Sequence, residues 1–158
     1  MKSVFVMMCL MLSAVLLAPT LLASSLQDYR LDADQSYLEG NFKKAHKLYT
    51  KLAKFGDHYS QDRVAQMYAA GEGKNANLTE AYAWSVLAAE VGDAELMNHS
   101  SELLQRTDDK EQAQKRAAKL RKKYGEHALR TKAIRHAVRN NYKKSGACTG
   151  THLACARG

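Results

Sequence analysis

Apolar residues recur at helical spacing through most of this chain. After Asn41, the apolar residues Phe42, Ala45, Tyr49 and Leu52 follow one another at i, i+3, i+7 and i+10, which places them on one stripe of a helix. The chain contains a single Pro and is rich in good helix formers, which argues against an all-β sandwich. The pattern therefore predicts an all-α protein.

Helix-ending and helix-starting signals surround these stripes. Gly56 and Gly92 stand just after apolar stripes, where a left-handed C-cap favours glycine. Asn77, with Glu80 three residues later, is well placed as an N-cap. Alanines that allow close helix approach, and aromatic residues that fill the gaps between hairpins, are expected at Ala45, Ala53, Ala81, Ala88, Ala89, Tyr49, Tyr68, Tyr82 and Trp84.

The middle of the chain repeats itself. Segment 45–57 aligns with segment 81–93 at an offset of 36 residues. The identical pairs are Ala45/Ala81, Ala53/Ala89, Gly56/Gly92 and Asp57/Asp93. The turns before the two segments align at an offset of 31, so the second unit carries a turn five residues longer. A period between 20 and 50 residues indicates a solenoid, in which one helical pair cannot bury its own apolar face.

Two further segments complete the predicted architecture. Residues 94–106 form a helix, and Asp108 and Asp109 begin another that Gly125 closes. The stripe of this second helix is Ala113, Ala117, Leu120 and Tyr124. A last helix over about 126–142 is expected to turn Leu129, Ala133, Ile134, Ala137 and Val138 inward. The prediction is a short α-solenoid of two to three antiparallel hairpins over 26–125, plus an extra C-terminal helix.

The unit over 65–93 resembles a Sel-1-like repeat, a helical hairpin related to tetratricopeptide repeats. The family pattern is a Tyr-x-x-Gly-x-Gly turn followed by Lys-Ala-x-x-Trp and Ala-Ala-x-x-Gly. The matching residues are Tyr68, Gly71, Gly73, Ala81, Trp84, Ala88, Ala89 and Gly92. Glu80 stands where Lys is usual, and the unit over 31–57 lacks both the Gly-x-Gly turn and the Trp. The resemblance implies a scaffold that binds proteins or peptides on a concave surface, often in the bacterial envelope.

The N-terminal segment reads as a targeting signal. Residues 1–25 have one charge, at Lys2, then a largely apolar run from Val4 to Leu17 and small residues around Ala23 and Ser25. This is the pattern of a secretory signal peptide with cleavage near Ala23 or Ser25. An uncleaved membrane anchor is the alternative, because the apolar stretch approaches the roughly 20 residues that span a bilayer. We therefore expect an exported protein, periplasmic or secreted.

Export leaves two cysteines, Cys148 and Cys155, because Cys9 lies inside the signal. A close pair in an exported chain predicts a disulfide within the C-terminal section, 126–158. A metal site that includes His152 is the rival interpretation, but it lacks paired C-x-x-C spacing and a fourth ligand. We expect neither a metal nor a cofactor.

Charge is divided unevenly along the chain. Residues 26–107 hold nine Lys or Arg against twelve Asp or Glu, a net charge of −3. Residues 108–158 hold fourteen against four, a net charge of +10. This asymmetry indicates either an anionic partner or a solvated helix face. Acidic lipid, acidic polysaccharide and acidic protein faces fit export better than nucleic acid, for which no recognised motif is present.

The sequence offers little for catalysis. The Ser-x-x-Lys motif of serine acyl-enzymes is missing, and the six histidines are scattered without His-x-x-x-His spacing. We expect a non-catalytic scaffold of the periplasm or envelope that binds a protein or peptide partner through the concave face of its repeats. The alternative is an anion-binding module that docks through its basic C-terminal section.

Overall fold

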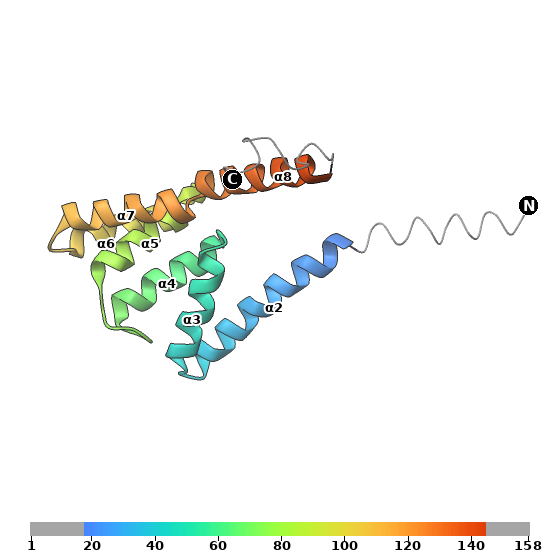
Figure 1. Cartoon of the computed structure of the whole chain (residues 1–158). Coiled ribbons are helices and arrows are strands. Elements are labelled where there is room, and N and C mark those ends of the chain that lie inside the picture. The colour runs from blue at the N-terminus through green and yellow to red at the C-terminus, as the bar shows by residue number, and fades with distance from the viewer. Residues whose placement is uncertain (1–17, 145–158) are drawn as a thin grey trace, which may run out of the picture.

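The computed structural model describes residues 18–144, and this part of the chain is all helical, as predicted. No strand occurs between residues 18 and 144. The elements are α2 (Ala18–Leu38), α3 (Phe42–Ala53), α4 (His58–Ala70), α5 (Leu78–Ala88), the short 3-10 helix η1 (Ala89–Val91), α6 (Ala94–Arg106), α7 (Lys110–Tyr124) and α8 (Glu126–Lys144) (Figure 1).

The glycine–aspartate pairs of the repeat form the corners between helices. Gly56 and Gly92 have φ of 90° and 82°, the left-handed conformation predicted for them. The aspartate after each glycine caps the next helix: Asp57 accepts the Ser60 N–H at 3.0 Å, and Asp93 caps α6 in the same way. Each pair therefore lies at a corner between helices: Gly92 is the C-cap of η1, whereas α3 already ends at Ala53 with Lys54 as its C-cap.

The predicted N-cap of α5 is also confirmed. The Asn77 side chain accepts the Glu80 backbone N–H at 2.9 Å. The Glu80 carboxylate does not fold back onto the cap, but pairs with Arg116 of α7 at 2.6 Å. Glu80 therefore takes part in the N-cap of α5 through its backbone N–H and in a tertiary ion pair through its carboxylate.

Helix α5 is the centre of the packing. It contacts α4, α6 and α7, whereas α2 packs on α3 and α3 packs on α4. Helix α7 packs mainly against α5 and barely touches α6, so the third pair is not a tight hairpin. The indole of Trp84 explains this preference, because it stacks on the Tyr124 ring of α7 with centroids 5.9 Å apart and planes at 17°.

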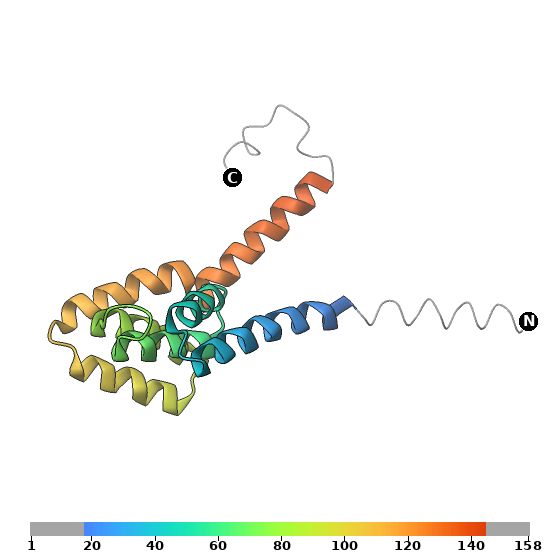
Figure 2. The same ribbon diagram turned by 90° about the horizontal axis from the view of Figure 1, so that it is seen from below.

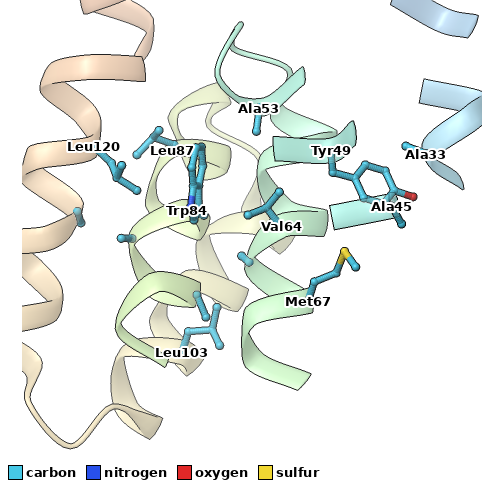
Figure 3. Packing of buried hydrophobic residues seen from close by; sticks show 14 residues of the cluster. Ala33, Ala45, Tyr49, Ala53, Val64, Met67, Trp84, Leu87, Leu103 and Leu120 are labelled. Atoms are coloured by element: carbon cyan, nitrogen blue, oxygen red, sulfur yellow. The ribbon is translucent and has the colours of Figure 1, made fainter. Parts of the chain in front are cut away.

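One apolar core joins α2 through α7 (Figure 3). The predicted stripes of α3 and α7 point into this core, and Trp84 is 4% exposed between them. The buried apolar members are Ala33, Ala45, Tyr49, Ala53, Val64, Ala65, Met67, Ala81, Ala83, Trp84, Leu87, Leu103, Ala117 and Leu120. None of the described residues of α8 belongs to the cluster.

The inward face predicted for the last helix is wrong. Of the five expected residues only Leu129 is partly covered; Ala133 and Ala137 are exposed, and Ile134 and Val138 are 63% and 50% exposed. Helix α8 leaves the bundle after its first turns and extends on the same side as the start of α2 (Figures 1 and 2). In a solenoid the next repeat covers such a stripe, and no described helix takes that place here.

Several predictions concern the ends of the chain. Helix α2 begins at Ala18 and so runs through the expected cleavage positions at Ala23 and Ser25. The apolar run up to Leu17, and the cysteines Cys148 and Cys155, lie outside the described residues. Within residues 18–144, no helix is both long and apolar enough to cross a membrane.

His46 is a buried histidine on α3, 5% exposed. Its ring lies edge-on to Tyr68, with centroids 4.9 Å apart. Burial, and then the nearby Lys74 charge, lower the pKa of this imidazole below its ordinary 6.5. The folded protein therefore favours the neutral ring.

We expect this histidine to make stability depend on pH. As the pH falls below about 6.5, the unfolded chain binds a proton at His46 before the folded chain does, so the free energy of unfolding decreases. Urea unfolding of the wild type and of His46→Gln at pH values from about 5 to about 7.5, which extend roughly one unit either side of the ordinary pKa, measures this change. The free energy of unfolding of the variant should depend less steeply on pH. His127→Gln, at an exposed site, is the control, and equal slopes for all three proteins would contradict the assignment.

Candidate interaction surface

Side chains of α2, α4 and α6 form a connected polar and aromatic arrangement, which we call the cross-helix network. It bridges helices whose backbones are not in close contact with one another. Its members are Arg30, Asp34, Tyr37, Tyr59, Asp62, Arg63, Gln66 and His99, with Tyr49 of α3 beneath them.

Asp34 anchors the end of the network on α2. It accepts the Tyr49 hydroxyl at 2.5 Å and the Tyr59 hydroxyl at 2.9 Å. Burial, reinforced by these hydrogen bonds to Asp34, raises the pKa of both tyrosines. Both hydroxyls stay protonated at neutral pH and donate to the carboxylate, so α2 is tied to α3 and α4 by charge-assisted hydrogen bonds.

Arg63 of α4 lies at the middle of the network. Its guanidinium carbon is 4.2 Å from the centre of the Tyr37 ring and 5.6 Å from that of Tyr49. Its Nη1 donates to Gln66 Oε1 at 2.8 Å. Aromatic faces on two neighbouring helices therefore hold this cation in place.

Asp62 carries the network from α4 to α6. It accepts from Gln66 Nε2 at 2.6 Å and from His99 Nδ1 at 2.7 Å. Both groups remain partly accessible to solvent, with side-chain exposures of 15% and 25% for Asp62 and His99. This pair gives α6 a polar attachment to α4 at the surface.

A hollow of about 590 Å3 opens beside the Asp62–His99 pair. Three carboxylates line it, those of Asp62, Glu95 and Glu102, together with Asn98 and His99. Among the described residues, no group of three or more His, Cys, Asp or Glu side chains is arranged to hold a metal ion. The negative charge of the hollow suits a Lys or Arg side chain instead.

The repeat-signature residues lie in the scaffold rather than in the network. Ala81, Trp84 and Ala88 are buried, Tyr68 and Ala89 are partly buried, and Gly71, Gly73 and Gly92 form left-handed turns. They shape and space the helices that present the network. The sequence predicted that the three alanines, Tyr68 and Trp84 would pack between helices; Ala81, Ala88 and Trp84 are buried, and Tyr68 and Ala89 are partly buried.

The network itself was not predicted. A polar stripe on α4, with Tyr59, Asp62 and Gln66 at i, i+3 and i+7, was the signal that could have indicated it. The partners Asp34 and His99 lie 25 and 37 residues from their contacts, beyond the reach of local patterns. Comparison with protein-family models, with curated proteins and with solved structures yields no match.

Proposed function

We propose that this chain is a non-catalytic interaction scaffold, an exported Sel-1-like repeat protein of the periplasm or cell envelope. It binds a partner protein through the face shared by α2, α4 and α6. The cross-helix network carries this proposal, because it holds charged and aromatic side chains of three helices in defined positions at the surface. Groups that are already ordered lose less entropy when a partner binds.

The charge of this face suggests the chemistry of the partner. Glu95 and Glu102 are exposed at the rim of the acidic hollow, and Tyr59 is 45% exposed on α4. A basic side chain placed in the hollow would gain carboxylate contacts, while tyrosine supplies apolar area with a polar tip. We therefore propose a partner segment with at least one Lys or Arg.

The double variant Glu95→Lys/Glu102→Lys is expected to lose its partner. Affinity capture by the full-length chain from an extract of its source cells, quantified by mass spectrometry, should show about a tenfold loss or more, because both rim charges become repulsive. Both residues are exposed, so folding should be little affected. Glu39→Lys/Glu111→Lys makes the same change of charge elsewhere, also with one residue in the first turn of a helix. Equal capture by the two variants would place the partner on another surface.

A second candidate function rests on α8. This helix exposes Ile134 and Val138 beside Arg135 and Arg139, outside the core. Apolar side chains flanked by arginines suit an acidic lipid surface, and the arginines alone suit an acidic polysaccharide. Charge-driven docking of this kind should weaken steeply with salt. It should not be affected by Glu95→Lys/Glu102→Lys, which separates it from binding at the network face.

A further inference from the structure

A groove along α3 gathers lysine side chains that form no ion pair within the part of the chain that the structure describes. It has a volume of about 1000 Å3, and the loop between α4 and α5 contributes part of its lining. We call it the α3 groove. Its lysines, all exposed, are Lys43, Lys47, Lys51, Lys54 and Lys74.

The positive charge of the α3 groove is locally unbalanced. Over the part of the chain that the structure describes, none of its lysines forms an ion pair. Lys51 rests over the Tyr29 ring instead, with Nζ 4.4 Å from the centroid. Composition does not explain this surplus, since residues 26–107 carry a net charge of −3. Like charges along one groove repel one another, and an anionic ligand would relieve that repulsion.

The groove also presents apolar surface and a buried polar atom. Phe55 is 72% exposed in it, and Leu48 and Tyr68 are half-buried there. His46 forms part of the lining, and its buried Nε2 has no hydrogen-bond partner among the described residues. An exposed aromatic ring beside unpaired charges is typical of a binding surface, and core packing gives no reason for it.

We propose that the α3 groove binds an extended, acidic peptide segment of a partner protein, with an apolar side chain placed against Phe55. Helix α3 is about 16 Å long, which matches roughly five residues of extended chain. Alternating acidic and apolar side chains would meet the lysines and the apolar lining together. This surface is separate from the network face, so the two proposals stand independently.

Charge and shape favour this occupant over others. The segments of this chain outside the description, 1–17 and 145–158, contain no Asp or Glu, so they have no acidic side chain to pair with the lysines. An acidic polysaccharide offers the charge but little apolar surface for Phe55. A bilayer surface is flat, whereas the α3 groove is hollow. An acidic protein segment supplies negative charge for the lysines and apolar surface for Phe55, and it can lie within a hollow.

Selection from a random display library of peptides of about twelve residues tests the proposal. The full-length chain is the bait, and the strongest selected peptides are then measured by fluorescence polarisation. We expect selected peptides rich in Asp and Glu that also carry Phe, Leu or Ile. Binding should fall about tenfold or more in Lys47→Glu/Lys54→Glu. It should also weaken in Phe55→Ser.

Two control variants separate an effect on the α3 groove from a general effect of changed charge. Lys110→Glu/Lys119→Glu applies the same change of charge to exposed residues of α7 and should bind the peptides like the wild type. Glu95→Lys/Glu102→Lys should also retain them, which separates this test from that of the network face. The proposal is overturned if the selected peptides are not acidic, or if the α7 variant loses them equally. It is also overturned if a heparin fragment or anionic vesicles bind as well as the peptides and Phe55→Ser has no effect.

Discussion

Trp84→Ala is expected to destabilise the fold by about 4 kcal/mol, the cost of removing a large buried aromatic side chain. Trp84 is 4% exposed and stacks on Tyr124, so the substitution leaves a cavity between α5 and α7. Domains of this kind are stable by only about 5–15 kcal/mol. The variant should therefore unfold at a much lower urea concentration, or fail to fold at all. Urea titration followed by circular dichroism measures the change.

Two controls identify the cause of this loss. Trp84→Phe keeps an aromatic ring against Tyr124 and should lose markedly less stability than the alanine variant. Phe55→Ala removes an aromatic ring that is 72% exposed and should change stability by no more than about 0.5 kcal/mol. A folded Trp84→Ala protein with the wild-type unfolding midpoint would show that the indole is not part of the core.

Gly73→Ala is expected to cost about 3 kcal/mol or more, although it adds a single methyl group. Gly73 has φ of +74°, and a Cβ there would lie 2.3 Å from the backbone oxygen of Phe42. Phe42 is the first residue of α3, so its backbone cannot easily move away. The loop would have to separate from α3. Urea unfolding of the variant measures the loss.

Gly71→Ala and Gly40→Ala separate backbone strain from this clash. Both glycines have nearly the same φ, +77° and +75°, but a Cβ at Gly71 meets nothing closer than 3.4 Å and one at Gly40 meets nothing within 4 Å. Each should cost only the left-handed strain, about 1–2 kcal/mol. If Gly73→Ala were no worse than these two, the long turn would not pack on α3 as described.

The turn that contains Gly73 was predicted from the sequence, but its packing against α3 was not. The Tyr-x-x-Gly-x-Gly turn and the five extra residues of the second unit predicted a longer turn before α5. They did not indicate that the second glycine of this turn meets Phe42, 31 residues earlier in the chain. A turn residue reveals its φ through local chemistry, whereas its neighbours in space depend on how the helices pack.

Helix α8 shows the same limit of prediction from the sequence. Its periodic apolar residues indicated a helix correctly, but periodicity states only which residues share a stripe and not whether anything covers it. Leu129 lies against the corner at Gly56, and Lys132 still donates to the Lys123 carbonyl at 2.6 Å, but the apolar stripe of α8 after Leu129 lies outside the apolar core. Ile134 and Val138 therefore face solvent.

Local chemistry along the sequence determined the helices of this protein and their ends. Asn77, Asp93 and Asp109 cap helices because their side chains reach backbone N–H groups two or three residues away. The left-handed Gly56 and Gly92 form the corners after helices for an equally local reason. Only the tertiary structure decided which side chains share a face. The cross-helix network and the α3 groove each combine residues from separate elements, and these residues become neighbours only after the apolar core has placed their helices.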